Sequence, residues 1–174
     1  GEFSGYTFSV EGLADMPFDT PAAQQLPAGW LAGVPGRTVA AVHAEACAAL
    51  GGNVEILINN AGGNARGNTS KKPAEIDVED FVANYRANTL GAVQLCQLSV
   101  PDMVAAKFGR IVNVSSAVAM QPNYMGTDYS AAKAALLNYT VSLAGSLRGV
   151  NVTANVLTPG IIMVDGVLRF GRQR

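Results

Sequence analysis

The stretch ILINNAG, from Ile56 to Gly62, decides the fold of this chain. It begins with the aliphatic run of a buried parallel strand, predicted at Val54–Asn59, and continues into a tight polar turn. Ala61 and Gly62 keep this turn free of bulky side chains, so a flat cofactor could approach its backbone. In open parallel sheets, ligands lie beyond the carboxyl ends of the strands. An ordinary asparagine–glycine turn has the same pattern, so the remaining chain must decide between a site and a plain turn.

Helices alternate with strands on both sides of this stretch. Two further segments rich in valine, isoleucine and leucine are predicted to be buried strands, Arg110–Ser115 and Val150–Leu157. Three segments are predicted to be helical: Thr38–Leu50, a long helix that Asp77 can cap and that runs to about Lys107, and Asp128–Leu147. This alternation predicts an α/β fold, a Rossmann-like doubly wound parallel sheet with helices on both faces in three α/β/α layers.

The composition excludes several classes of protein. With 174 residues, 49% of them hydrophobic and 14% charged, the chain can fold as one domain with a real core. Its formal net charge of −1 gives no reason to expect nucleic acid or an anionic membrane as a partner. No apolar run approaches the ~18 residues of a transmembrane helix, and no signal peptide is visible. We therefore expect a cytoplasmic protein with no membrane partner.

The histidine and cysteine content narrows the chemistry. His43 is the only histidine and is predicted to be an exposed helix position, so we expect no metal site and no Ser-His-Asp triad. Cys47 and Cys96 are predicted to be buried free thiols within helices, and a disulfide between them is the alternative. Free thiols fit a reducing, cytoplasmic setting.

A second motif can carry acid–base chemistry. Tyr129 and Lys133 are four residues apart on one face of a predicted helix, and Ser116 ends the strand before it. A phenol with a pKa of about 10 needs a shift of about 3 units to ionise near neutral pH, which costs roughly 4 kcal/mol. An ammonium ~6 Å away supplies about 2.8 kcal/mol at an effective dielectric constant of ~20. A second positive charge, such as an oxidised nicotinamide ring, would supply the rest, and Ser116 would orient a substrate oxygen.

Five motifs in matching order resemble the short-chain dehydrogenase/reductase family, in its ketoreductase-like branch, over residues 38–160. They are Asn59-Asn60-Ala61-Gly62, Asn88 within Ala87–Gly91, the strand Gly109–Ser116, the pair Tyr129 and Lys133, and Thr158-Pro159-Gly160. Each motif alone is weak, but five at matching spacing are highly specific. The resemblance implies an NAD- or NADP-dependent oxidoreductase that interconverts a small-molecule ketone and a secondary alcohol by hydride transfer.

The resemblance also implies a role for each matched residue. Tyr129 is expected to be the general acid/base, and Lys133 to lower its pKa and hold the nicotinamide ribose. Ser116 is expected to orient the carbonyl, and Asn88 to hold a relay water. The residues implied to bind the cofactor are Asn60, Ala61, Gly62, Tyr129, Lys133, Pro159, Gly160 and Ile162. The family pairs its subunits through the helix around residue 90 and the helix after Asp128, so the resemblance implies a homodimer or homotetramer.

Both ends of the chain depart from the family pattern, so the fold is expected to be truncated. The family's Thr-Gly-x-x-x-Gly-x-Gly loop, which cradles a pyrophosphate, is not found, and the nearest segment, Gly29–Gly36, has one residue too many and contains Pro35. Ile161–Leu168 resembles the family's final strand, moved up against Pro159-Gly160. We predict a single Rossmann-like domain over residues 1–174, with an irregular segment at 1–37, a core at 38–160, and a terminal strand and tail at 161–174.

These departures leave alternatives open. Either absent stretches would restore the loop and the substrate lid, or the protein is a natural or engineered deletion. The missing loop favours a second function, a non-catalytic scaffold or oligomerisation module that has lost cofactor binding. A third possibility is a lyase or isomerase, because Ser116 and Tyr129 could polarise a carbonyl without hydride transfer. The choice between NAD and NADP and the identity of the substrate are set by segments that the sequence does not reveal.

Overall fold

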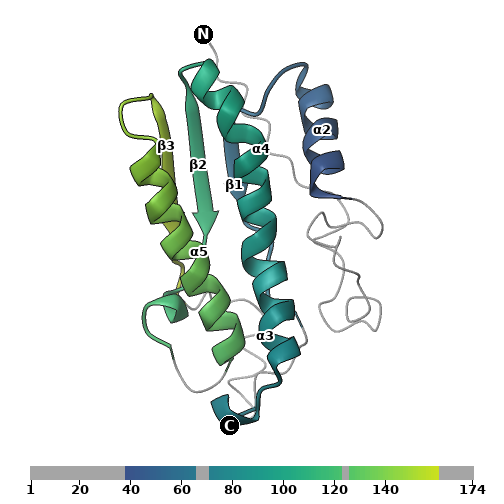
Figure 1. The fold of residues 1–174 in the computed structure, drawn as a ribbon, viewed down its shortest axis with the longest axis vertical. Coiled ribbons are helices and arrows are strands. Elements are labelled where there is room, and N and C mark those ends of the chain that lie inside the picture. The colour runs from purple at the N-terminus through teal and green to yellow at the C-terminus, as the bar shows by residue number, and fades with distance from the viewer. Residues whose placement is uncertain (1–37, 66–70, 123–125, 161–174) are drawn as a thin grey trace.

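Three parallel strands form the central sheet of the described part of the chain (Figure 1). The structure is a computed structural model, and it describes residues 38–65, 71–122 and 126–160. The strands are β1 (Ile56–Asn59), β2 (Gly109–Val114) and β3 (Val152–Leu157), in that order across the sheet. Ile56 lies opposite Arg110, and Gly109 lies opposite Val152. The three predicted strands are confirmed, and their ends differ from the prediction by at most 2 residues.

Helices connect the strands in the predicted order. They are α2 (Val39–Leu50) before β1, α3 (Val78–Tyr85) and α4 (Gly91–Ala105) between β1 and β2, and α5 (Thr127–Ser146) between β2 and β3. A π-helical segment, Arg86–Leu90, joins α3 to α4, and Pro101 lies inside α4. The single long helix predicted here is therefore interrupted by a wider turn, for which the sequence carries no compositional signal.

Local sequence explains where these helices begin and end. The Thr38 hydroxyl caps α2 by accepting a hydrogen bond from Ala41 N at 3.1 Å, and Gly51 ends α2 in the left-handed conformation, with φ of 66°. Asp77 is the N-cap residue of α3, as predicted, but its side chain accepts a hydrogen bond from the Lys71 ammonium at 2.7 Å and forms an ion pair instead of a capping bond.

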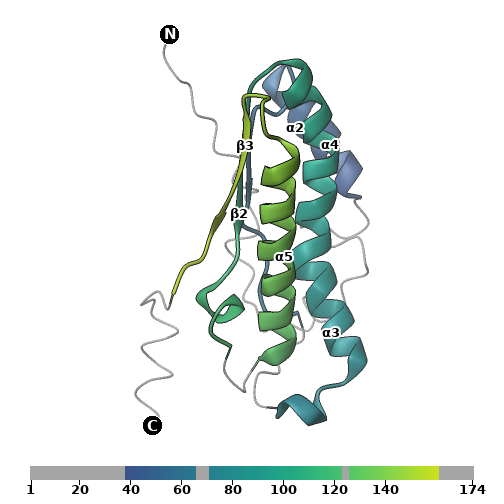
Figure 2. The same cartoon turned by 60° about the vertical axis from the view of Figure 1, so that its left-hand side comes forward.

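The described helices pack on one face of the sheet (Figures 1 and 2). Alternate residues of β2 and β3 point toward these helices, as the two-residue period of a strand requires. The buried core consists of Val54, Cys96, Met103, Ile111, Leu147, Val152 and Ala154. Gly109 allows α4 to approach β2 closely, because a Cβ at this position would lie 2.6 Å from the Met103 sulfur.

A row of buried polar side chains crosses this core. Asn59 Nδ2 donates to Asn113 Oδ1 at 2.7 Å, and Asn113 Nδ2 donates to Thr140 Oγ1 at 2.9 Å. Asn59 and Asn113 are register partners on β1 and β2, and Thr140 lies on α5. The row therefore fixes two strands and one helix relative to one another, as buried hydrogen-bonded networks do.

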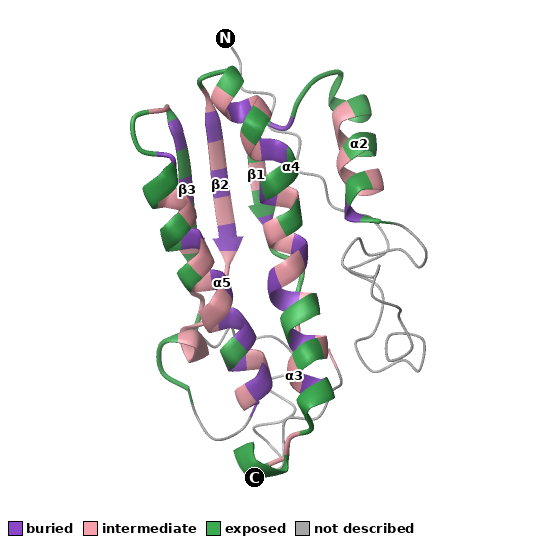
Figure 3. Ribbon diagram, in the orientation of Figure 1, coloured by how far each residue is buried: buried purple, intermediate pink, exposed green. Residues whose placement is uncertain are grey.

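No described helix covers the opposite face of the sheet (Figure 2), and part of β1 is coloured as exposed in Figure 3. On this face Ile56, Ile58 and Leu157 are 53%, 60% and 55% exposed. The structure thus describes the sheet and one helical layer of the predicted three-layer fold. The predicted irregular segment at 1–37, with its loop candidate Gly29–Gly36, and the predicted terminal strand at 161–174 lie outside the described residues. The single-domain organisation over 1–174 stays a prediction.

None of the described helices is both long enough and apolar enough to cross a membrane. Within the same residues, no three histidine, cysteine, aspartate or glutamate side chains gather in a way that could hold a metal ion.

Candidate active site

The carboxyl ends of β1, β2 and β3 bring three predicted segments to one edge of the sheet (Figure 1). The turn Asn60–Gly62 follows β1, Ser116 lies just after β2, and Thr158–Gly160 follows β3. The last two segments contact each other, since Ala117 N donates to Pro159 O at 2.9 Å. This shared edge is where open parallel sheets bind their ligands.

Helix α5 brings Tyr129 and Lys133 to the same edge. Lys133 is 3% exposed, and its Nζ donates to the carbonyl oxygen of Val114, the last residue of β2, at 2.8 Å. The same nitrogen lies 5.9 Å from the centroid of the Tyr129 ring, so both side chains lie on one side of the helix. A side-chain hydrogen bond joins Tyr129 to Ser116. The structure therefore brings these three predicted residues together.

Two buried hydroxyls hold α5 in this position. Ser115 Oγ donates to Lys133 O at 2.8 Å, and Thr89 Oγ1 donates to Ala132 O at 2.7 Å. The first bond joins α5 to the end of β2, and the second joins it to the π-helical segment. The main chain beside Lys133 is thus fixed from two directions.

Asn88 and Gly62 complete the predicted set. Asn88, in the π-helical segment, is 2% exposed. Its Oδ1 accepts from Gly63 N at 2.9 Å, and its Nδ2 donates to Gly63 O at 2.8 Å. A Cβ on Gly62 would lie 2.6 Å from Asn88 Oδ1 and 3.0 Å from Lys133 Nζ. The turn after β1 therefore needs a glycine for a reason that the sequence does not show, namely the close approach of two side chains of this chain.

Burial dominates the electrostatics of the site. It raises the pKa of Tyr129 above the ordinary value of 10.0, and the hydrogen bond with Ser116 opposes this rise. Burial also lowers the pKa of Lys133 from 10.5 to about 8. The direction for Tyr129 is opposite to the sequence prediction, because the sequence gives the spacing of the two residues but not the desolvation of the phenol.

Comparison with known proteins agrees with this geometry. The model of the short chain dehydrogenase family matches residues 35–172. The chain belongs to the short-chain dehydrogenase family. The sequence-based resemblance to this family is thus confirmed.

Two curated relatives of the chain are named as a reductase and a dehydrogenase. The chain is 36% identical to the 3-oxoacyl-(acyl-carrier-protein) reductase of Aquifex aeolicus, over 64% of the chain and 44% of the relative. It is 33% identical to the 7alpha-hydroxysteroid dehydrogenase of Escherichia coli (strain K12), over 67% of the chain and 44% of the relative. A crystal structure of a short-chain dehydrogenase/reductase family oxidoreductase from Burkholderia thailandensis matches with a TM-score of 0.66 and 28% identity, over 78% of this chain and 51% of that one.

The chain therefore spans less than half the length of these two curated relatives. This partial coverage fits the truncated Rossmann-like fold that the sequence predicts, and it agrees with the single helical layer in the described residues.

The residues expected to bind a cofactor are placed as follows in the chain. The turn Asn60–Gly62 and Gly160 are exposed, and Pro159 is half-buried. The space around Gly160 is open, because a Cβ there would have no neighbour within 4 Å. Ile162 lies outside the described residues.

Two buried residues next to the predicted set were missed by sequence reasoning. Asn84 is 0% exposed, and its Nδ2 donates to Asp128 Oδ2 at 2.7 Å. Asn84 lies one helical turn before Asn88, and Asp128 directly precedes Tyr129. An asparagine on the buried face of a predicted helix, four residues from a motif asparagine, is the signal that would have revealed Asn84, but no local signal reveals its pairing with Asp128.

The position predicted for His43 is corrected by the structure. His43 is half-buried, and its Nε2 lies 3.1 Å from the buried Ser99 Oγ of α4. The sequence predicts an exposed position because α2 carries no strong apolar stripe, but packing of α2 against α4 covers the ring. Cys47 and Cys96 are both free, as predicted, but only Cys96 is buried, whereas Cys47 is half-buried on α2.

Proposed function

We propose that this short-chain dehydrogenase interconverts a ketone and a secondary alcohol with NAD or NADP, and that Tyr129 is its general acid/base. One observation carries the proposal: Tyr129, Lys133 and Ser116 meet at the carboxyl ends of parallel strands, beside the exposed turns at Gly62 and Gly160. The names of the relatives, a 3-oxoacyl reductase and a 7alpha-hydroxysteroid dehydrogenase, support a carbonyl or alcohol substrate.

Each side chain has one task in the proposed reduction. Ser116 donates a hydrogen bond to the carbonyl oxygen and orients it. Tyr129 gives its phenolic proton to that oxygen while a hydride arrives at the carbonyl carbon, so the product is the neutral alcohol and the phenol becomes a phenolate. The Lys133 ammonium, 5.9 Å from the ring centroid, stabilises the phenolate. In the oxidation direction the same proton returns to Tyr129.

Asn88 is proposed to help restore the proton on Tyr129. Its side-chain amide is engaged with both polar groups of the Gly63 main chain. A relay water is therefore proposed to contact the main chain of residue 88 within the π-helical segment, while the side chain keeps the turn after β1 in place.

The described residues fit the nicotinamide end of a dinucleotide. Asn60, Ala61, Gly62, Lys133, Pro159 and Gly160 form the proposed contacts, with Ile162 proposed from the sequence alone. A bound NAD or NADP would supply or accept the hydride. Residues 38–65, 71–122 and 126–160 include no glycine-rich strand-to-helix turn that would cradle the pyrophosphate. The second candidate function is a scaffold or oligomerisation module that does not bind the cofactor, because the sequence lacks the family's Thr-Gly-x-x-x-Gly-x-Gly motif.

Titration separates the two candidates. Increasing amounts of the full chain would be added to NADH and, separately, to NADPH, and nicotinamide fluorescence would be recorded. Saturable binding in the micromolar range supports the enzyme, whereas no binding of either dinucleotide overturns it and favours the scaffold. The cofactor that binds is then used with a panel of ketones, 3-oxoacyl thioesters and hydroxysteroids.

The proposed role of Tyr129 has its own test in Tyr129→Phe, which removes only the hydroxyl. The turnover number should fall by a factor of about 10² to 10⁴, the range of general acid–base catalysis, while the melting temperature changes little. Tyr85→Phe is the matched control, because Tyr85 is 43% exposed and lines the hollow between α3 and α5 instead of the edge of the sheet. Full turnover in Tyr129→Phe would remove the phenol from the mechanism.

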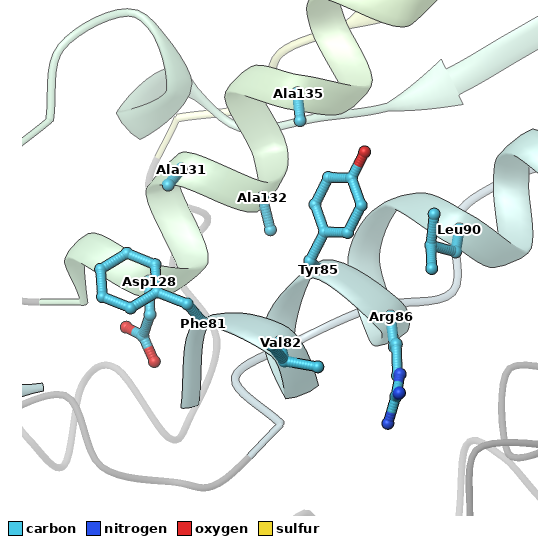
Figure 4. Close-up of a pocket in the computed structure, with 9 residues that line it drawn as sticks. All are labelled: Phe81, Val82, Tyr85, Arg86, Leu90, Asp128, Ala131, Ala132 and Ala135. Atoms are coloured by element: carbon cyan, nitrogen blue, oxygen red, sulfur yellow. The ribbon is translucent and has the colours of Figure 1, made fainter. Parts of the chain in front are cut away.

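The proposed assembly is a homodimer or homotetramer. A hollow of about 510 Å³ lies between α5 and the helix run of α3 and the π-helical segment (Figure 4). Its walls are mainly apolar, and the lining residues are Phe81, Val82, Tyr85, Arg86, Leu90, Asp128, Ala131, Ala132 and Ala135. These are the two helices that the sequence resemblance assigns to subunit pairing. A cytoplasmic location is also proposed, and the two free thiols support it.

A further inference from the structure

The buried amide of Asn84 connects three elements. It lies in the last turn of α3 and is 0% exposed. Its Oδ1 accepts from Ala65 N at 3.1 Å, and its Nδ2 donates to Asp80 O at 3.2 Å and to Asp128 Oδ2 at 2.7 Å. A primary amide has two N–H donors, so both are used. The segment after β1, helix α3 and the first turn of α5 therefore meet at one side chain.

The first turn of α5 has few other attachments. Its N-cap is Gly126, which has no side chain and makes no side-chain capping bond. The first four N–H groups of a helix have no partner within the helix, so an uncapped first turn opens easily. Thr89 and Ser115 bind the main chain of Ala132 and Lys133, one turn further on. Within the described residues, two side-chain bonds join the first turn to other segments: the Asn84–Asp128 bond and the bond between Tyr129 and Ser116.

Tyr129 lies in this first turn, directly after Asp128. Asn88 lies one turn after Asn84 on the same helix run, and Asn88 Nδ2 donates to Asn84 O at 3.0 Å. The two amides therefore act one above the other on the same helix run. Asn88 holds Gly63 after β1, and Asn84 holds α5 beside Tyr129. A short hydrogen bond to a carboxylate is stronger than one between neutral groups, so it suits a tether.

We propose that Asn84 is a positioning residue, which fixes the first turn of α5 through Asp128 and so places the Tyr129 phenol against Ser116 and Lys133. The catalytic part of this inference rests on the proposed function, but the tether itself does not. Asn84 does not touch the reacting atoms, and its effect is on geometry. Misplacement by about 1 Å can reduce a rate by roughly 10²-fold, so the position of one turn matters.

Two substitutions of Asp128 separate the tether from the charge. Asp128→Ala and Asp128→Asn both remove the negative charge, but only the asparagine keeps an oxygen that accepts from Asn84 Nδ2. The other oxygen, Oδ1, is buried without a hydrogen-bond partner among the described residues, so the amide nitrogen can take its place without breaking a bond. Asn84→Ala cuts the tether from the other side, and the Asp128 pair keeps the test decisive if that variant does not fold.

Hydrogen exchange tests the Asn84–Asp128 tether without a measurement of activity. The amides of Ser130 and Ala131 are the first of α5 that can be hydrogen-bonded within the helix, and Ser130 N donates to Gly126 O at 2.9 Å. These amides should exchange about tenfold faster or more in Asp128→Ala, because a hydrogen bond to a charged group is lost, and should stay near the wild-type rate in Asp128→Asn. The exchange rates of the amides of α4 should not change in either variant. Equal exchange in the alanine variant and the wild type, or equal acceleration in both variants, would overturn the tether.

Two further measurements test whether Tyr129 keeps its position. Difference absorbance titration, with Tyr129→Phe as the reference, gives the pKa of this phenol. Burial raises that pKa, so in Asp128→Ala it should fall toward 10.0, while Asp128→Asn should keep it raised. In an active enzyme, the turnover number should fall by about 10- to 100-fold in Asp128→Ala with KM within about twofold, and Asp128→Asn should restore most of it.

The outcomes distinguish the two proposals. Full turnover in Tyr129→Phe would remove the proposed function, while the exchange and titration data would still decide the tether. An unchanged pKa of Tyr129 in Asp128→Ala would overturn the positioning role even if Tyr129 is catalytic.

Discussion

At the scale of single residues, Lys133 shows how a functional group acts against stability. Its ammonium is 3% exposed, and burial lowers its pKa from 10.5 to about 8. The carbonyl of Val114 offers it one hydrogen bond, at 2.8 Å. A buried charge without a full counter-charge destabilises the folded state, so this residue is retained for what its charge does beside Tyr129.

This shift predicts how stability depends on pH. Between pH 8 and about 10.5 the unfolded chain binds a proton at Lys133 that the folded chain has released, so the free energy of unfolding should rise with pH in this window. Across this pH window, the free energy of unfolding of the wild type should rise by about 3 kcal/mol more than that of Lys133→Met. Urea unfolding at closely spaced pH values measures this difference. Lys107→Met, at an exposed lysine, is the control, and parallel curves for wild type and Lys133→Met would contradict the buried ammonium.

Gly62 gives a second prediction at this scale. Gly62→Ala places a Cβ 2.6 Å from Asn88 Oδ1 and 3.0 Å from Lys133 Nζ, so one of these side chains must move. We expect a loss of about 1–3 kcal/mol in the free energy of unfolding, as for other overpacked sites. Gly145→Ala is the matched control. Gly145 lies in α5 with no atom within 4 Å of its Cβ position, so alanine there should stabilise by about 0.5–1 kcal/mol.

The opposite signs of the two substitutions are the test. Gly62 has a φ of 156°, so backbone strain adds to the effect of the close approach of Asn88 and Lys133. Equal effects in thermal or urea unfolding would show that neither the backbone conformation nor these side chains require a glycine at this position.

At the scale of elements, the sequence predicts best what depends on periodicity. The strands β2 and β3 and the helix α5 were predicted because aliphatic runs and helical spacing persist over many residues. The π-helical segment at Arg86–Leu90 was not predicted, since one extra residue in a turn leaves no mark in composition. Asn84 and Asp128 were missed for a different reason. Their pairing joins residues 44 positions apart, and nothing local records it.

The polar row across β1, β2 and α5 gives an element-scale prediction. Asn113→Ala would leave the Asn59 amide and the Thr140 hydroxyl without their partner, so the free energy of unfolding should fall by about 2–4 kcal/mol, from one or two buried groups at about 1–3 kcal/mol each. Asn155→Ala is the matched control, because Asn155 is an exposed asparagine on β3 and should change stability by less than about 0.5 kcal/mol. Chemical denaturation of both variants provides the comparison, and similar values would mean that the row is not structural.

At the scale of the whole molecule, the two faces of the sheet differ. One carries the helices and the core, and the other exposes Ile56, Ile58 and Leu157 within the described residues. A parallel sheet is normally covered on both faces, because its strands are apolar on both. The proposed site does not depend on the second face. Its residues all come from elements between β1 and β3, namely Tyr129, Lys133, Ser116 and Asn88. The chemistry-bearing half of the fold could therefore be predicted from motifs, whereas the cofactor cradle could not.

The hollow between α3 and α5 supports a prediction about assembly. Val82 lines it and is 42% exposed, and alanines on α5 leave room for side chains of a second copy (Figure 4). In a two-fold interface the same patch serves both subunits, so Val82→Arg places a new charge on each side at once. The wild type should sediment as a dimer or tetramer at roughly 10–100 μM, and Val82→Arg should shift it toward monomer. Leu50 is 39% exposed at the end of α2, and Leu50→Arg should sediment as the same oligomer as the wild type. A monomeric wild type, or a monomer produced equally by both variants, would separate this hollow from subunit pairing.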